Sequence, residues 1–318
     1  MKQDLLNFYR GSRAGKLLLS FPRHLYKSLA NRYLSDEAWC RDRFSWDQGY
    51  SLNLRNSKTL NEKLQYLKLF NRDPELAFWA DKYGVRERVR EILGERFLIP
   101  LLAISEDPAR IQFEELVEPF IVKPTHSSGK TIIVRDRREA NWTDVRRACH
   151  GWLKSNFYPV AREWHYKDIP PRIIVEKLLQ DSAGELPSDF KCHCFHGRVV
   201  FVQVDIDRHT NHKRNFYDRN WSRMPFTWSV CVGSAPMWPP GREIDRPEKL
   251  IQMIDASEAL AKRFPYVRMD WYLLEENLFF GEATFNHGGG FERILPIEWD
   301  CKLGDLLQLD STHAQPVG

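Results

Sequence analysis

The feature that most constrains the fold is a set of short apolar runs in the second half of the chain, spaced as hairpin partners. Residues 191–195 and 198–206 flank His196-Gly197, and residues 266–274 and 278–285 flank a short polar segment. Apolar and β-branched runs separated by two or three turn-forming residues are typical of antiparallel strands. We therefore expect an α+β fold dominated by antiparallel pairs.

Helical patterns precede these strands. Thr59 stands before a run with helical spacing, and Glu62 follows it by three residues, which is a capping box. Asp73-Pro74 starts a second predicted helix, which ends near Gly94. Further helices are expected at residues 247–264 and 299–309, and further strands at 97–104, 120–122, 131–134 and 172–176.

The composition indicates a chain that buries a substantial core. Of its 318 residues, 42% are hydrophobic, and this length suits two domains or one larger domain built of lobes. Its 47 Lys and Arg against 43 Asp and Glu leave a net charge of +4, less than a nucleic-acid-binding protein usually carries. Six cysteines are too few for a disulfide-stapled secreted protein, and the apolar stretch near the start is far shorter than a membrane span. We therefore expect a cytoplasmic protein with no nucleic-acid partner.

Residues 1–34 form a basic arm, with seven Lys and Arg against Asp4 alone and with leucines and phenylalanines between them. A basic amphipathic stretch can lie on an anionic membrane surface, here the inner face of the membrane. A packed helix with one solvated face explains the pattern equally well.

The sharpest local signal is the sequence IVKPTHSSGKT at residues 121–131. Its ending, Gly129-Lys130-Thr131, suggests a Walker A motif, but Pro124 stands where that motif needs glycine, and a β-branched run follows instead of a helix. A serine and glycine loop between two strands can still present backbone N–H groups to phosphate, and Lys123 and Lys130 would add charge at its two ends. A surface turn with solvated lysines is the alternative.

A second signal is a predicted hairpin near the C-terminal end of the chain. Its turn is expected to be Glu275-Glu276-Asn277, with the asparagine in the left-handed conformation. Asp270 then faces Glu282, and Arg268 faces Thr284, on one side of the sheet. Two opposed carboxylates repel one another, so a cation is expected between them. Arg268 supplies part of that charge, and Mg²⁺ shared with nucleotide phosphates is the other explanation. A ladder of solvated charges is the alternative.

Three other clusters have residue types that could bind a ligand. Cys192, Cys194 and His196 alternate along one strand, but such a pattern is weak evidence for zinc, and buried cysteines are the alternative. Residues 208–214 hold two arginines, one lysine and two histidines, which suits an acidic sugar or polymer as well as a solvated loop. The segment 162–166, REWHY, would contact a sugar face or pack between lobes.

Several of these motifs, in this order, resemble the ATP-grasp family. The resemblance is carried by Lys123 at a strand end, the serine and glycine loop, the segment Ile174–Leu179, and Arg268-x-Asp270 with Glu282. The sequences LNEKLQ at 60–65, REWHY at 162–166, TNHKRNFY at 210–217 and GEATF at 281–285 are similar to the teichuronopeptide-biosynthesis (TupA-like) branch. The similarity spans about residues 50–309.

The resemblance implies an ATP-grasp fold, in which two α+β lobes with antiparallel sheets grip ATP after a helical N-terminal region. The expected divisions are a basic helical arm at 1–57, an α/β region at 58–118, the first lobe at 119–178 and the second lobe at 179–318.

The resemblance also implies roles for single residues. Lys123 would contact the ATP phosphates and act in catalysis, and Arg268 would stabilise the reacting phosphate or the tetrahedral intermediate. Asp270 and Glu282 would bind Mg²⁺ with Thr284, which stands where relatives often have asparagine. The other expected ATP contacts are Ser127, Ser128, Gly129, Lys130, Glu176, Lys177, Leu178, Leu179 and Lys191. The basic and aromatic clusters add Arg162, His165, Arg208, His212, Lys213 and Arg214 as expected substrate contacts.

The implied reaction consumes ATP. A carboxylate attacks the γ-phosphate to give an acylphosphate, and an amine then displaces phosphate to form an amide. Lys, Arg and Mg²⁺ around the phosphoryl oxygens would act by positioning and electrostatic stabilisation. The resemblance indicates an amino acid or other amine joined to a uronic acid of a cell-surface polysaccharide. A glycosyltransferase or a noncatalytic polysaccharide-assembly protein is the alternative.

Overall fold

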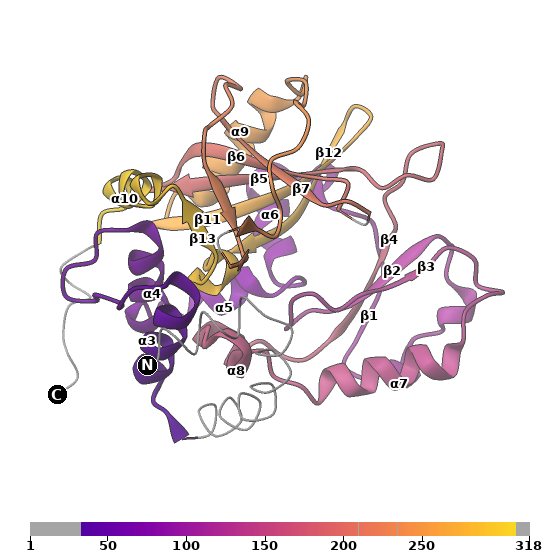
Figure 1. Ribbon diagram of the computed structural model, residues 1–318. Helices are drawn as coiled ribbons and strands as arrows, with labels where there is room; N and C mark the ends of the chain where they lie inside the picture. Colours follow the sequence, from indigo (N-terminus) through magenta and orange to yellow (C-terminus); the bar gives the residue numbers. More distant parts are fainter. Residues whose placement is uncertain (1–32, 209, 234, 310–318) are drawn as a thin grey trace.

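The computed structural model describes residues 33–208, 210–233 and 235–309. Its largest part is a five-stranded antiparallel sheet with the order β12-β11-β5-β6-β7 (Figure 1). The strands are β5 (Ser188–Phe195), β6 (Arg198–Ile206), β7 (Lys213–Asp218), β11 (Tyr266–Leu274) and β12 (Asn277–Thr284). The two hairpins that the sequence predicts, β5-β6 and β11-β12, therefore form and are joined edge to edge through β5 and β11.

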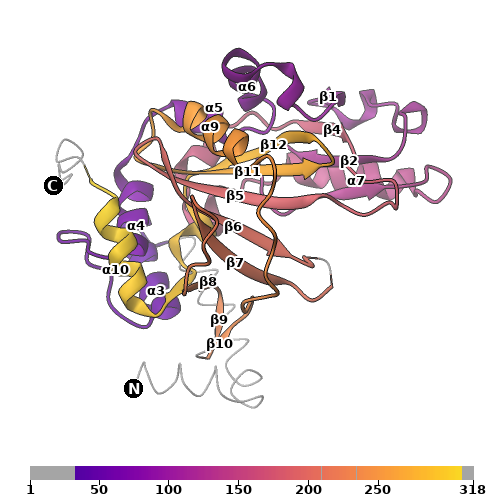
Figure 2. The same cartoon turned by 90° about the horizontal axis from the view of Figure 1, so that it is seen from above.

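One face of this sheet is apolar and covered by two helices. The helices α9 (Leu250–Ala261) and α6 (Val85–Leu93) share the largest buried cluster with Cys192, Cys194 and Trp271. Helix α9 lies against β5, β6 and β11, and α6 lies against α9 (Figure 2). Burial raises the pKa of both thiols, so these cysteines are apolar core residues.

The opposite face of the sheet is polar, because successive side chains alternate between the two faces of a strand. Strand pairing aligns the polar residues of neighbouring strands in rows across this face. Three such rows contain Arg268 and His193; Asp270, Lys191 and Gln203; and Tyr272, Asp189, Asp205 and Arg214. Residues that are far apart in the sequence are thereby brought onto one surface.

A smaller, four-stranded antiparallel sheet forms a second lobe, with the order β1-β4-β2-β3. Its strands are β1 (Leu101–Ser105), β2 (Phe120–Pro124), β3 (Ile132–Val134) and β4 (Ile173–Lys177). Helix α7 (Trp142–Leu153) packs on one face, where Phe120 and Val175 are fully buried with Cys149. The loop of residues 125–130 joins β2 to β3, so a strand follows it where a Walker A motif requires a helix.

A helical layer covers the end of the large sheet that points away from the small one (Figures 1 and 2). It consists of α3 (Asp36–Gln48), α4 (Leu60–Phe70) and α10 (Ile297–Leu306). The predicted capping box forms at the start of α4: Thr59 Oγ1 accepts from the Glu62 backbone, and the Glu62 carboxylate accepts from the Thr59 N–H. Asp300 accepts two hydrogen bonds of 3.0 Å from Asn61, which fastens α10 to α4.

Short elements connect these parts. They are α5 (Glu75–Ala80), α8 (Tyr158–Ala161), the strands β8 (Thr227–Ser229), β9 (Cys231–Val232), β10 (Ala235–Pro236) and β13 (Arg293–Leu295), and 3-10 turns at Glu95–Phe97, Pro108–Arg110, Phe113–Glu115, Trp164–Lys167 and His287–Gly290. Strand β8 pairs with β13, and β9 pairs with β10. A helix of the length and apolarity needed to cross a bilayer does not occur within the described ranges.

Some elements differ from the sequence prediction. The helix expected to end near Gly94 is divided into α5 and α6, because Asp81 Oδ1 accepts from the Tyr83 N–H at 3.1 Å and stabilises a turn there. The strand expected from residue 97 begins at Leu101, where β4 supplies its backbone partners. The segment 207–245, which shows no periodic pattern, contains β7 to β10.

Candidate active site

The turn of the β11-β12 hairpin is shorter than the sequence prediction. It consists of Glu275 and Glu276, and Leu274 pairs directly with Asn277. Glu275 takes the left-handed conformation, with a φ of 53°, in place of Asn277. The predicted three-residue loop is therefore wrong.

A bulge farther along the hairpin compensates for the shorter turn. The register shifts between Met269 and Trp271 of β11, so that Gly281 and Glu282 together lie opposite Asp270. Beyond the bulge the pairing of β11 with β12 agrees with the prediction again. The two carboxylates thus meet on the polar face in spite of the altered turn.

Arg268 is the centre of the polar cluster on this hairpin. Its Nε and Nη2 donate to the two oxygens of Asp270, both at 2.6 Å. Its Nη2 also donates to Glu282 Oε1 and Thr284 Oγ1, both at 3.2 Å. Its Nη1 donates to His287 Nδ1 at 2.5 Å. Because a guanidinium is a rigid fork, these contacts fix the plane of the group.

The two carboxylates of the hairpin have different pKa values. Burial raises the pKa of Asp270 to about 6, although Arg268 opposes this shift. Burial also raises the pKa of Glu282, but Lys82 and Arg268 outweigh it and lower the pKa to about 2. The Glu282 side chain is 35% exposed, so solvent screens part of this attraction. Both groups are ionised at neutral pH.

The donor set fits a hard divalent cation that also has phosphate ligands. Glu282 Oε1 accepts hydrogen bonds from Arg268 and Thr284. The other carboxylate oxygen, Glu282 Oε2, lies 4.0 Å from Lys82 Nζ. Asp270 contacts Arg268 through both oxygens, each of which keeps a further lone pair. Mg²⁺ commonly takes one or two protein carboxylates and completes its shell with phosphates and water. Within residues 33–208, 210–233 and 235–309, no group of three or more His, Cys, Asp or Glu could hold a metal ion alone.

Lys82, which sequence reasoning did not single out, connects the hairpin with the loop of residues 125–130. It lies in the turn between α5 and α6, and its Nζ donates to the Ser127 carbonyl oxygen at 2.5 Å. The same Nζ is 4.0 Å from Glu282 Oε2. Burial lowers the pKa of this ammonium. The loop of residues 125–130 and the acidic hairpin, distant in the sequence, are therefore bridged by one partly buried lysine.

Lys123 and Glu176 lie side by side on neighbouring strands of the small sheet. Lys123 Nζ donates to Glu176 Oε2 at 3.0 Å, and Arg86 Nη1 donates to Glu176 Oε1 at 2.7 Å. Arg86 also donates to the Ile99 carbonyl oxygen at 2.8 Å, which fastens α6 to the segment before β1. Arg86 is a second residue that sequence reasoning missed. The one feature of the sequence that could have indicated it is its position four residues after Lys82.

The loop of residues 125–130 is buried at its beginning and open at its end. Residues 125–127 are at most 2% exposed, whereas Gly129 is exposed with a φ of 73°. Lys130 Nζ donates to Ser155 Oγ at 2.7 Å. The buried Ser127 Oγ has no hydrogen-bond partner in the part of the chain that the structure describes. A buried hydroxyl of this kind usually meets water or a ligand.

Lys191 lies among carboxylates on the polar face of the large sheet. Its Nζ pairs with Asp189 and lies 3.5 Å from Asp205 and 3.7 Å from Asp270. The lysine is 4% exposed, and its charge balances these acids beside the hairpin. At the end of β4, Leu178 and Leu179 are buried and Lys177 is exposed.

The predicted substrate residues of the 208–214 segment lie on the same polar face. Arg208 Nη1 donates to Asp189 Oδ2 at 2.9 Å, and His212 Nε2 lies 3.2 Å from Asp205 Oδ1. Lys213 is half-buried at the start of β7. This basic segment therefore borders the acidic row that contains Lys191.

Arg214 differs from its neighbours in that protein groups surround its guanidinium. Its Nε donates to Asp205 Oδ1 at 2.8 Å, and its Nη1 donates to the Trp228 carbonyl oxygen at 2.7 Å and to Glu292 Oε2 at 2.9 Å. Trp238 covers it with the ring centroid 4.3 Å from Cζ.

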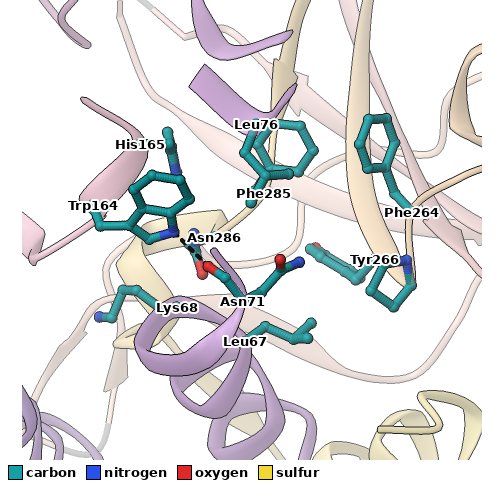
Figure 3. A pocket seen from close by; sticks show the side chains of 11 residues that line it. Leu67, Lys68, Asn71, Leu76, Trp164, His165, Phe264, Tyr266, Phe285 and Asn286 are labelled. Atoms are coloured by element: carbon teal, nitrogen blue, oxygen red, sulfur yellow. Dashed lines mark hydrogen bonds between the residues drawn. The ribbon is translucent and has the colours of Figure 1, made fainter. Parts of the chain in front are cut away.

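His165 and Arg162 lie apart from this cluster, His165 against α4 and Arg162 against α3. His165 lines a small cavity of about 20 Å³, large enough for a water molecule (Figure 3). Beside it Trp164 Nε1 donates to the Asn71 carbonyl oxygen at 2.5 Å. Burial lowers the pKa of His165 to about 3, so the ring is neutral. Arg162 Nη1 lies 3.4 Å from Asp36, which connects this segment to α3.

Comparison with known proteins identifies the family. The family model described as TupA-like ATPgrasp matches residues 62–308, which is most of the chain. The chain belongs to the TupA-like ATP-grasp family. The resemblance inferred from the motifs is confirmed, and so is the fold class of two antiparallel sheets with a partly helical N-terminal region. No curated protein sequence gives a significant match.

Solved structures that resemble this member of the TupA-like family include ATP-grasp ligases. The D-alanine–D-alanine ligase from Bacillus anthracis, complexed with ATP, is 16% identical with a TM-score of 0.40, and the match covers 65% of this chain and 54% of that chain. The ATP-grasp ligase PsnB with its minimal precursor is 13% identical with a TM-score of 0.41, covering 77% and 63%. The ADP complex of PurK, N5-carboxyaminoimidazole ribonucleotide synthetase, is 14% identical with a TM-score of 0.39, covering 70% and 50%. The chain thus spans about half to two thirds of the length of these proteins.

Proposed function

We propose that this protein is an ATP- and Mg²⁺-dependent ligase that joins a carboxylate to an amine through an acylphosphate. The observation that supports this most strongly is the position of Lys82 between the Ser127 carbonyl and the Glu282 carboxylate. A partly buried ammonium that lies between a serine and glycine loop and an acidic hairpin suits a triphosphate with its cation.

In the proposed complex, each charged residue has a separate task. Lys82 and Lys123 hold the phosphates, and the loop residues Ser127, Ser128, Gly129 and Lys130 cover them. Asp270, Glu282 and Thr284 hold Mg²⁺, which when bound neutralises phosphate charge and polarises the phosphoryl group. Arg268 stabilises charge on the reacting phosphate. Glu176, Lys177, Leu178 and Leu179 would contact adenine and ribose, and Lys191 would complete the phosphate contacts.

The proposed reaction balances in two steps. A carboxylate oxygen of the first substrate attacks the γ-phosphorus, the bond from that phosphorus to ADP breaks, and an acylphosphate forms. The amine nitrogen then attacks the acyl carbon, the carbon–oxygen bond to phosphate breaks, and an amide, phosphate and a proton result.

The proposed substrates are an amino acid or other amine and a uronic acid of a cell-surface polysaccharide. Support comes from the basic residues Arg208, His212 and Lys213, which border the acidic row and suit an anionic sugar. Arg162, beside α3, and His165, beside α4, would contact the substrate apart from these basic residues. We place this activity in the cytoplasm, with the basic arm at residues 1–34, nearly all outside the described residues, as the part that would touch the inner face of the membrane.

The test is ADP release in the presence of Mg²⁺ and pools of amino acids and uronic acids. We expect ADP only when both pools are present or, with the acid alone, at a slow rate. Absence of ATP binding and of ADP with every pool would exclude the ligase. Transfer from a nucleotide sugar in the same assay would support a glycosyltransferase instead.

A further inference from the structure

We propose that His287 is a positioning residue that holds Arg268 in the orientation its chemistry needs, and that Glu292 and Arg214 hold His287 in turn. The inference rests on the proposed function, because Arg268 is the group assigned to the reacting phosphate. It also assigns Arg214 to this support and not to substrate contact.

The His287 ring is fixed by aromatic neighbours. It follows β12 in the 3-10 turn His287–Gly290 and is 2% exposed. The Trp228 ring lies edge-on to it at 4.3 Å between centroids and 74° between planes. The His193 ring does the same from the large sheet at 5.3 Å and 76°. Packing on two sides fixes the plane of the imidazole.

The contact with Arg268 decides where the His287 proton lies. A guanidinium can only donate, so His287 Nδ1 accepts from Arg268 Nη1 at 2.5 Å and the ring proton must sit on Nε2. Nε2 lies 3.2 Å from Glu292 Oε2, although not in line for a well-formed hydrogen bond with any group that the structure describes. Burial lowers the pKa of His287 to about 4 in spite of Glu292, so the ring is a neutral acceptor at neutral pH.

Glu292 is itself held in place. Arg214 Nη1 donates to Glu292 Oε2 at 2.9 Å, and Asp205 fixes the other side of that guanidinium. Burial raises the pKa of Glu292, but His287 and Arg214 outweigh it and lower the pKa to about 2. A Cβ at Gly288, whose φ is 55°, would lie 2.5 Å from Glu292 Cγ. Only glycine therefore lets the turn close over the Glu292 side chain.

The result is a buried series of polar contacts that ends at the proposed reaction centre. It runs from Asp205 through Arg214, Glu292 and His287 to Arg268. Without His287, the Arg268 guanidinium keeps its two hydrogen bonds to Asp270 but loses the hydrogen bond that Nη1 donates. A displacement on the order of 1 Å at a reacting group can cost about 100-fold in rate.

The first test is a double-mutant cycle on ADP formation with the substrate pools. H287A should lower kcat about 100-fold with little change in the KM for ATP, because the nucleotide contacts remain. H287Q, which keeps an acceptor and a donor, should stay within about tenfold of the wild type. In an R268K background, H287A should cost less than about threefold, since the residue it positions is already replaced. Equal losses in both backgrounds would overturn the proposal. H150A, at an exposed histidine of α7, serves as the control and should match the wild type.

The second test needs no substrate. Nitrogen-15 NMR of labelled histidines, with the His287 signals assigned from H287Q, should show a neutral ring with the proton on Nε2 at about pH 7. A proton on Nδ1, or a charged ring, would overturn the proposal even if H287A fails to fold. If the wild-type protein forms no ADP, the proposed ligase function is contradicted. The tautomer of His287 would still show whether the ring accepts a hydrogen bond from Arg268.

Discussion

Glu282 is the residue whose charge the proposed metal site depends on most. Its Oε1 bonds to Arg268 and Thr284, while its Oε2 faces Lys82 at 4.0 Å. E282Q keeps the shape of the side chain but removes the negative charge. We expect a loss of at least about tenfold in affinity for Mg²⁺ with a nonhydrolysable ATP analogue, measured by calorimetry.

The same hairpin offers a matched control for this variant. Glu276 lies in the exposed turn and pairs with Lys249 at 3.0 Å, far along the strand from the cluster. E276Q should bind the nucleotide as the wild type does. Identical affinities for E282Q and E276Q would contradict the metal site.

Asp300 gives a pH dependence whose sign can be worked out. The side chain is fully buried, and burial raises its pKa to about 6, although hydrogen bonds from Asn61 oppose the shift. An unfolded aspartate has a pKa of about 3.9, so below about pH 6 the native state binds a proton that the unfolded state does not yet bind. The contribution of Asp300 to stability therefore increases as the pH falls.

The variant D300N isolates this contribution. From about pH 7 to about pH 4.5, the free energy of unfolding of the wild type minus that of D300N should rise by about 2 kcal/mol. Urea unfolding at both pH values measures it, and comparison with D300N cancels the titration of His165 and His287. If this difference in the free energy of unfolding stays constant or falls between about pH 7 and about pH 4.5, the pKa of Asp300 is not raised in the native state.

At the scale of elements, the turn between α5 and α6 supports the loop of residues 125–130. Lys82 of that turn donates to the Ser127 carbonyl oxygen at 2.5 Å. K82A should increase amide hydrogen exchange in residues 125–130 and weaken nucleotide binding, because the loop loses its contact with the hairpin side of the site. K154A, at the exposed end of α7, is the control. Unchanged exchange in K82A would mean that the loop is held by the small sheet alone.

The contact of α10 with the start of α4 is a second test at this scale. A Cβ at Gly304 would lie 2.1 Å from the Lys58 carbonyl oxygen, so G304A forces the two helices apart. We expect a loss of about 3 kcal/mol or more in the free energy of unfolding. Gly151 in α7 has no atom within 4 Å of its Cβ position, and G151A should be neutral or stabilise by up to about 1 kcal/mol. Thermal unfolding of both variants decides whether helix packing is as close as described.

At the scale of the whole molecule, local patterns predict the elements better than the contacts between them. The hairpins and the capping box at Thr59 follow from short-range rules and form as expected. The length of the β11-β12 turn is not predicted correctly. A two-residue turn followed by the bulge at Gly281 and Glu282 gives Arg268 the same partner, Thr284, as a three-residue turn without a bulge. Counting residues from the turn therefore cannot predict where a bulge restores the pairing of the two strands.

The site shows the same division. Arg268, Asp270 and Glu282 are recognisable from alternation along two strands, and Lys123 from its loop. Lys82 and Arg86 are not, since only the fold brings the turn before α6 to Glu282 and the start of α6 to Glu176. The roles proposed for His287 and Glu292 could not be predicted from the sequence, because they depend on the contact of Arg214 in β7 with Glu292, after β12. The division into four regions and the role of the basic arm stay predictions.

The central claim is that this protein activates a carboxylate as an acylphosphate, and oxygen isotope transfer tests it most directly. Uronic acids labelled with ¹⁸O in the carboxylate, supplied with ATP, Mg²⁺ and a pool of amines, would be converted and the released phosphate analysed by mass spectrometry. The carboxylate oxygen that attacks phosphorus leaves with the phosphate, so we predict one ¹⁸O atom in each phosphate formed with ADP. Phosphate without ¹⁸O, formed at the same rate as ADP, would contradict the account.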